Sequence, residues 1–184
     1  MPTEMIDLDE LGLSFGGATS LDGGVELGEV EIGGQTYLPE PEVAPFRLDL
    51  SRTSAGYALR LRFRSSLAGP CFRCLERAGA EVEVDAREVD QPSLNGIEGV
   101  DLDPDESGLV LAELDSPSVD KGVLALRQWA HDALILALPN QIICREDCLG
   151  LCPVCGESLN GADPADHDHG QTGDPRWAKL RDLG

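Results

Sequence analysis

The sequence predicts an α+β fold: an antiparallel sheet with one long helix, then a C-terminal zinc-knuckle segment and a short terminal helix. Two patterns carry this prediction. Three stretches within residues 46–86 alternate apolar and charged side chains, which is typical of half-buried strands. Residues 119–138 repeat apolar side chains at steps of three and four, as an amphipathic helix does. A set of spaced cysteines follows this helix.

The predicted strands cover residues 46–50, 57–64 and 81–86. Their period of two places apolar side chains on one face and charged side chains on the other. The charged positions are arginines on the second strand and acids on the third. We expect these charges to pair across the solvent face, each pair contributing about 0.2–1 kcal/mol.

The remaining elements are predicted from caps and breakers. Ser118 is a favourable N-cap for the helix, and Pro139 ends it. Residues 109–114 are a candidate fourth strand, and the Asp-Pro pair at 174–175 opens the terminal helix. The acidic stretch 90–108 lacks the glycine and glutamate of an EF-hand loop, so we expect a solvated loop.

Composition divides the chain into three regions. Residues 1–44 form an acidic, Gly-rich N-terminal extension, expected to be a flexible lead or a few weak edge strands. Residues 45–140 form the α+β core, with the first CxxC pair in the connection between the second and third strands. Residues 141–184 form a Cys/His zinc-binding segment and the terminal helix.

The net charge of −20 favours basic proteins as partners and repels nucleic acid at long range. Residues 45–80 reverse the sign, with seven arginines against two acids. They are the one credible surface for phosphate contact, unless the arginines simply occupy the wet face of a sheet. The candidate RNA or partner contacts are Arg60, Arg62, Arg64 and Arg73, with Arg47 and Arg52 beside them. The sequence has no apolar run of about 18 residues and no secretory signal, so we expect a cytoplasmic protein without a membrane span.

Eight side chains have the identity and spacing of zinc ligands. They are Cys71, Cys74, Cys144, Cys148, Cys152, Cys155, His167 and His169. Two thiols separated by two residues can chelate one soft cation, and a closed structural zinc site takes four ligands, so one or two ions are expected. A disulfide framework does not suit a chain without a secretory signal, and neither CxxC pair lies in the βαβ unit of a thioredoxin-type redox site.

The spacing permits two partitions of these ligands. In the first, Cys152 and Cys155 join His167 and His169, while the pair at 71 and 74 meets the cysteines at 144 and 148. In the rival arrangement, a single site joins the two CxxC pairs, as in a zinc ribbon. The cysteines at 144 and 148 are then small buried residues.

Several motifs resemble a known family. They are CFRCLE at 71–76, LILALP at 134–139, DCLGLCPVCG at 147–156 with LN at 159–160, and DPRWAKL at 174–180. Together they resemble the YceD family, the large ribosomal RNA subunit accumulation proteins of bacteria and plastids. Many members carry Cys-x-Cys where this chain has His167-Asp168-His169, an exchange that preserves zinc-ligand capacity.

The resemblance implies a non-enzymatic ribosome biogenesis factor that supports accumulation or processing of large-subunit (23S) rRNA. It would bind a basic ribosomal protein, pre-rRNA or both, and no small-molecule substrate. The alternative is a zinc-dependent protein that binds rRNA directly through its arginine-rich sheet face. A metal-dependent hydrolase is a weaker option, because the His-x-Glu and His-Glu-x-x-His motifs of zinc deaminases and metalloproteases are absent.

Overall fold

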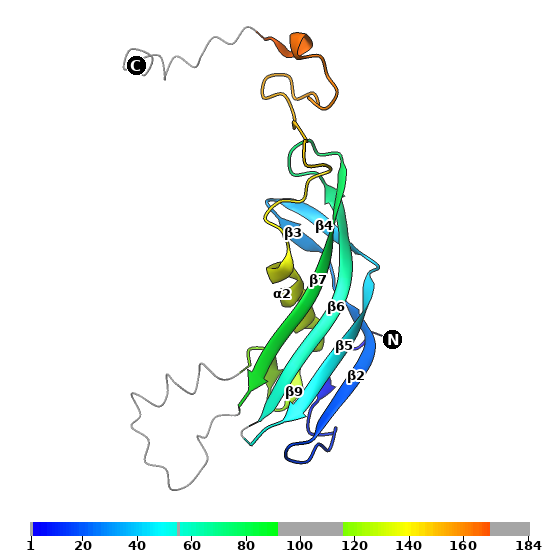
Figure 1. Cartoon of the computed structure of the whole chain (residues 1–184), viewed down its shortest axis with the longest axis vertical. Helices are drawn as coiled ribbons and strands as arrows, with labels where there is room; N and C mark the ends of the chain where they lie inside the picture. Colours follow the sequence, from blue (N-terminus) through cyan, green and yellow to red (C-terminus); the bar gives the residue numbers. More distant parts are fainter. Residues whose placement is uncertain (1, 55, 92–115, 170–184) are drawn as a thin grey trace, which may run out of the picture.

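The computed structural model describes residues 2–54, 56–91 and 116–169 (Figure 1). Within these ranges the main element is a twisted antiparallel sheet with one α-helix, α2 (Leu126–Ala137), against one face. The sheet contains β2 (Ala18–Glu26), β3 (Val30–Ile32), β4 (Gln35–Glu40), β5 (Val43–Arg52), β6 (Tyr57–Pro70) and β7 (Arg77–Asp90). A second, small sheet contains β1 (Ile6–Asp7), β8 (Val119–Asp120) and β9 (Val123–Leu124).

The long hairpin of β6 and β7 is the central element of the main sheet. These two strands pair over their whole lengths, from Tyr57 opposite Asp90 to Pro70 opposite Arg77. On its other side, β6 pairs with β5 near its start and with β4 near its end. The turn that closes this hairpin therefore projects from one end of the sheet, the upper end in Figure 1.

The inner face of the sheet forms the core, as the period of two in the sequence predicts. Leu48, Leu61 and Val84 come from successive strands and are buried. Helix α2 covers this face with its own buried side chains, among them Trp129 and Leu134. The predicted strands and their inward positions are thus confirmed, and so is the location of the first CxxC pair between β6 and β7.

The opposite face is charged, and its arginines pair with carboxylates. Arg60 pairs with Asp85 at 2.6 Å, Arg64 with Glu83 at 3.0 Å, and Arg62 with Asp49. The Ser20 hydroxyl and the guanidinium groups at 62 and 47 together lower the pKa of Asp49 to about 2, against its partial burial. The expected cross-strand pairing is confirmed, and such exposed pairs contribute little to stability because water and salt screen them.

Of the two expectations for residues 1–44, a flexible lead or weak edge strands, the structure shows strands, and these strands belong to the main sheet. Strand β2 pairs with β5 along nine positions, and β4 pairs with β6. Leu8, Val25 and Tyr37 are buried in the common core. Glycines at 23 and 24 weaken the periodic signal of β2, but pairing with the strongly periodic β5 holds this segment in the sheet.

The helix is shorter than the sequence predicts, which is a correction. It begins at Leu126 after the N-cap residue Ala125, and the expected cap Ser118 instead precedes a hairpin of β8 and β9. Lys121 and Gly122 form the two-residue turn of this hairpin, both with positive φ (50° and 81°), as a type I′ turn requires. The apolar residues at 119 and 123 fit helical steps but belong to strands.

Several expected elements lie outside the described residues: the strand at 109–114, most of the loop at 90–108, and the terminal helix from 174. No helix within the described ranges is long and apolar enough to cross a membrane.

Candidate metal centres

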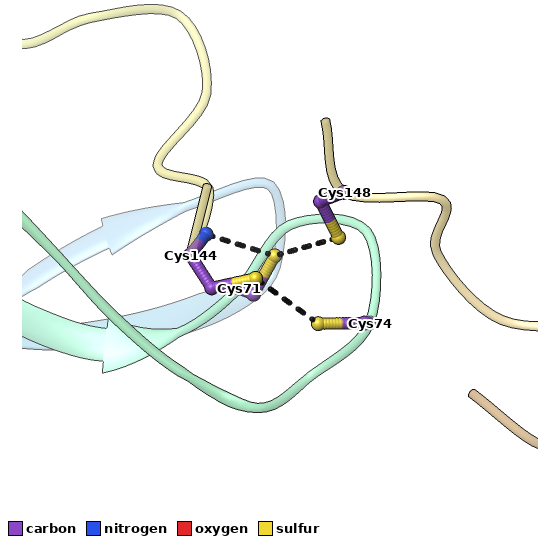
Figure 2. Close-up of side chains that lie close together, drawn as sticks. All are labelled: Cys71, Cys74, Cys144 and Cys148. Carbon is purple, nitrogen blue, oxygen red and sulfur yellow. Dashed lines mark hydrogen bonds between the residues drawn. The ribbon is translucent and has the colours of Figure 1, made fainter. Parts of the chain in front are cut away.

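The first candidate centre begins at the turn between β6 and β7. The N–H of Cys71 donates to the carbonyl of Glu76 at 2.6 Å, and the N–H of Leu75 donates back to the carbonyl of Cys71 at 3.0 Å. These bonds curl residues 71–76 into a tight knuckle. The thiols of Cys71 and Cys74 consequently face the same space, as Figure 2 shows.

Strand β4 packs against the residues that lead into this knuckle. Tyr37 is 1% exposed, and its hydroxyl donates a hydrogen bond of 2.8 Å to the carbonyl of Pro70, next to the first ligand. The ring occupies the space beside Gly69, where a Cβ atom would lie 2.4 Å from the Tyr37 ring. The N-terminal part of the chain therefore positions the first ligand pair.

The other two ligands of this centre come from the segment after α2. The N–H of Phe72 donates to the carbonyl of Ile142 at 2.8 Å, which holds this segment against the knuckle. The N–H of Cys144 points at the sulfur of Cys71, 3.3 Å away, and the guanidinium of Arg73 donates to the carbonyl of Cys148 at 3.0 Å. The side chains of Cys144 and Cys148 thus lie beside those of the first pair (Figure 2).

Two sulfur–sulfur distances in this group match those of a tetrahedral zinc site. The sulfurs of Cys71 and Cys148 are 3.8 Å apart, and those of Cys74 and Cys144 are 3.6 Å apart. Sulfurs that each lie about 2.3 Å from one zinc ion in a tetrahedron are about 3.8 Å from one another. Cys71, Cys74 and Cys148 are buried and Cys144 is partly buried, so the donor set suits an enclosed ion.

The thiols of this centre have shifted pKa values. Burial raises the pKa of Cys71, but backbone N–H groups of Cys74, Arg73 and Cys144 outweigh it and lower the value to about 6. Burial and the neighbouring thiols raise the pKa of Cys144 to about 12. The side chain of Asn160 is the main reason why the pKa of Cys148 is lowered. Several sulfurs crowded at low dielectric share negative charge poorly, and a divalent cation relieves that repulsion.

The second candidate centre is a knuckle built in the same way on a much shorter hairpin. Leu151 pairs with Ser158 as an isolated bridge. The N–H of Cys152 donates to the carbonyl of Glu157 at 2.8 Å, and that of Gly156 donates to the carbonyl of Cys152 at 2.9 Å.

Two histidines complete this second group. His167 ends the 3₁₀ turn η1 (Pro164–His167), and its Nδ1 lies 3.5 Å from the sulfur of Cys155. His169 lies beside it, with ring centroids 5.9 Å apart. Backbone N–H groups of Cys155 and Val154 are the main reason why the pKa of Cys152 is lowered to about 6. Cys152 is buried in this group, whereas Cys155 and His169 are exposed.

The structure brings the eight predicted ligands together as two groups of four. In each group the ligand atoms lie within 4.8 Å of one another: Cys71, Cys74, Cys144 and Cys148 in the first, and Cys152, Cys155, His167 and His169 in the second. This arrangement matches the first partition and not the rival single site. Both groups fit a four-coordinate ion.

Three residues around these groups carry no metal-ligand signal in the sequence. Tyr37 and Gly69 shape the first knuckle, and Gly150 has φ of 81° in a place where a Cβ atom would lie 3.2 Å from the carbonyl oxygen of Arg73. That glycine lets the chain cross close to the first knuckle on its way to the second. The sequence signal for this close approach is Gly150 itself, which follows DCL in the motif at 147–156.

In the part of the chain that the structure describes, fold and site define a class: an antiparallel sheet with one α-helix, and a four-cysteine group and a Cys/His group at one end of the sheet. Residues 59–184 match the family described as "Large ribosomal RNA subunit accumulation protein YceD". The chain belongs to the YceD family, and the resemblance seen in the sequence is confirmed.

Mycobacterial relatives agree with this assignment. The chain is 33% identical over 136 residues to an uncharacterized protein of Mycobacterium tuberculosis, Rv2926c, covering 74% of this chain and 59% of the relative. It is also 33% identical over 143 residues to an uncharacterized protein of Mycobacterium leprae, ML1660, covering 76% of this chain and 59% of the relative. The chain thus spans about three fifths of the length of these relatives. No solved structure matches it.

Proposed function

We propose that this protein is a non-enzymatic factor that supports accumulation of large-subunit ribosomal RNA in the cytoplasm. The observation that carries the proposal is the family match over residues 59–184, whose printed description is large ribosomal RNA subunit accumulation. The activity of the family thereby becomes an expectation for this chain.

Two structural zinc ions hold the functional end of the sheet in this proposal. A set of four cysteines and a set of two cysteines and two histidines are both zinc sets, because thiolate and imidazole are the ligands that zinc prefers. Catalytic zinc sites keep one position open for water or substrate. Each group here supplies four protein ligands, which favours a structural role over a hydrolytic one.

A basic ribosomal protein is the partner that the charge favours. The chain carries 34 acidic residues against 14 basic ones. On the charged face of the sheet, Arg60, Arg62 and Arg64 already pair with carboxylates. Their positive charge is therefore largely neutralised, which weakens the case for phosphate contact at that face.

The end of the sheet that carries the knuckles offers a contact surface for such a client. Phe72 and Leu75 on the first knuckle, Leu149 between the knuckles and Val154 on the second are 40–67% exposed. Exposed carboxylates such as Glu76 and Glu157 lie in the same loops. Apolar side chains with acids around them suit a basic protein with its own apolar residues.

Co-purification with ribosomal proteins at low and at physiological salt tests this proposal. We expect basic large-subunit proteins to be recovered, and recovery to fall when Leu149→Ser is combined with Val154→Ser. Leu136→Ser is the matched control, because Leu136 is 87% exposed on α2. Recovery of no basic protein at either salt concentration would contradict the client.

Direct binding to rRNA remains the second candidate, and Arg73 is the residue that favours it. Its guanidinium bonds a carbonyl at the knuckle rather than a carboxylate. Arg73→Glu should then weaken binding to large-subunit RNA and flatten its salt dependence, while Arg60→Glu with Arg62→Glu should do so only if the sheet face takes part. Unchanged RNA binding in both variants would exclude this route.

Elemental analysis tests the metal directly. Native protein purified without any chelator should contain two zinc ions per chain, and the Cys152→Ser variant should contain one. Protein that holds no metal would contradict the zinc centres.

A further inference from the structure

Asn160 is the one residue of the second knuckle's loop whose side chain reaches a ligand of the first centre within the described contacts. Its Nδ2 donates to the sulfur of Cys148 over 3.5 Å, and its Oδ1 accepts the N–H of Leu149 over 2.9 Å. The side chain is part-buried in this position.

The second of these bonds determines how the amide is oriented. The Leu149 atom in this contact is the backbone nitrogen, which can only donate, so the carbonyl oxygen of Asn160 must face it. The NH₂ group must then face the sulfur of Cys148. A donor held against a thiolate sulfur stabilises the charged form that a metal ligand needs.

The second knuckle holds Asn160 in place. The N–H of Asn160 donates to the hydroxyl of Ser158 at 3.3 Å, and the neighbouring N–H of Leu159 donates to the carbonyl of Gly150 at 2.9 Å. Ser158 itself is paired with Leu151 across the short hairpin that presents the second pair of thiols. The position of Asn160 therefore depends on the closure of the second knuckle.

We propose that Asn160 is a positioning residue that couples the two metal centres: the ion in the second group orders the loop that places the Asn160 amide on Cys148 of the first group. This inference rests on the proposed zinc centres. When the second ion leaves, the amide loses its support, and the first centre holds its own ion less well. The exposed second group thus adjusts the stability of the buried one.

Zinc release to a chromogenic chelator measures this coupling in the full chain. Asn160→Ala should release zinc from the four-cysteine centre about tenfold faster than the native chain, the usual effect of removing a partner of a metal ligand. Asn160→Asp should do the same, because it keeps an acceptor for Leu149 but puts an oxygen against the sulfur. Asn140→Ala, at an exposed asparagine between α2 and the cysteines, should release zinc at the native rate.

Emptying the second group tests the coupling itself. His167→Ala with His169→Ala should also speed release from the four-cysteine centre, and adding Asn160→Ala should produce no further acceleration. Cobalt substitution provides a second readout, since the thiolate-to-cobalt absorption of the first centre persists in every variant that still folds around four sulfurs.

The outcomes separate the inference from the proposal beneath it. Native rates in both Asn160 variants, or effects that simply multiply in the combined variant, overturn the coupling and leave the zinc centres standing. Native protein without any bound metal overturns both.

Discussion

The two knuckles have the same backbone construction in very different settings. In both, the first cysteine donates to the carbonyl five residues on and accepts the N–H four residues on. A residue with positive φ follows the second cysteine in each, Leu75 at 64° and Gly156 at 76°. The first knuckle closes two 14-residue strands, whereas the second closes a single bridge.

The ligands that complete each group come from different distances along the chain. Cys144 and Cys148 lie about seventy residues beyond the first knuckle, whereas His167 and His169 follow the second within the same loop region. An ion in the first group therefore ties the sheet to the segment after α2, and an ion in the second orders one local loop. The same local motif thus acts as a long-range clamp in the first group, where it joins distant segments, and as a local staple in the second, where it closes one loop.

Replacing one ligand in each knuckle should produce the largest difference. Cys71→Ser removes a fully buried ligand, and we expect it to lower the free energy of unfolding by more than about 4 kcal/mol, as loss of a structural metal does. Cys155→Ser should leave the sheet folded and unfold residues 150–169, while the four-cysteine centre keeps its ion but releases it faster. Hydrogen exchange measured by mass spectrometry distinguishes the two results. Equal loss of protection across the sheet in both variants would contradict the distinction between clamp and staple.

Filling the space beneath the first knuckle should have the next largest effect. In Gly69→Ala the new methyl group overlaps the ring of Tyr37, and overpacking of this kind costs about 1–3 kcal/mol. Urea denaturation measures this cost. In a Tyr37→Ala background the ring is gone and only the backbone carbonyl oxygen of Thr36, 2.9 Å from the new Cβ atom, still crowds it. Adding Gly69→Ala should therefore cost less there, and an equal cost in both backgrounds would argue against the contact with the ring.

Exchanging leucine and glycine at the positions of positive φ tests whether the two knuckles are structurally equivalent. Gly156→Leu puts a Cβ atom in the left-handed region, where no other atom lies within 4 Å of it, and should cost about 1–2 kcal/mol in the local loop through backbone strain. Leu75→Gly relieves the same strain but frees the unfolded chain, so we expect a net change below about 0.5 kcal/mol. Zinc release from each variant and thermal denaturation measure the two effects. A large loss of stability in Leu75→Gly would show that the Leu75 side chain, which is 56% exposed, contributes through contacts.

Removing one hydroxyl should cost less than either substitution that adds a side chain. Tyr37→Phe keeps the ring but loses the hydrogen bonds to Pro70 and Gln35, and should cost about 1 kcal/mol. Because Tyr37 lies under the first knuckle, zinc release should quicken at the four-cysteine centre only. Faster release from the second centre as well would place Tyr37 in the path between the centres.

The sequence by itself determined the elements that have a strong local period or spacing. The alternation along 57–64 predicts which face of β6 is buried, because successive side chains of a strand point to opposite faces. The CxxC spacing predicts each chelating pair, because a tight turn of four residues places both sulfurs on one side. These properties depend only on neighbouring residues.

The local pattern predicts the start of the helix wrongly, and in the N-terminal region it does not distinguish a flexible lead from strands. Val119 and Val123 fit helical steps, but the left-handed turn at Lys121 and Gly122 folds them into a hairpin. The glycines of β2 hide a strand whose stability comes from its partner β5. The strands that stabilise both segments, β1 beside β9 and β5 beside β2, lie outside the window in which a period can be seen.

Only the tertiary structure decided which ligands share a group and what lies beneath them. The end of α2 lies over the sheet so that the next segment meets the first knuckle through Ile142, and this brings Cys144 rather than Cys152 to Cys71. The contact of Asn160 with Cys148 arises in the same way. Such pairings depend on distances through space, and those are set by packing of the core rather than by the spacing of residues along the chain.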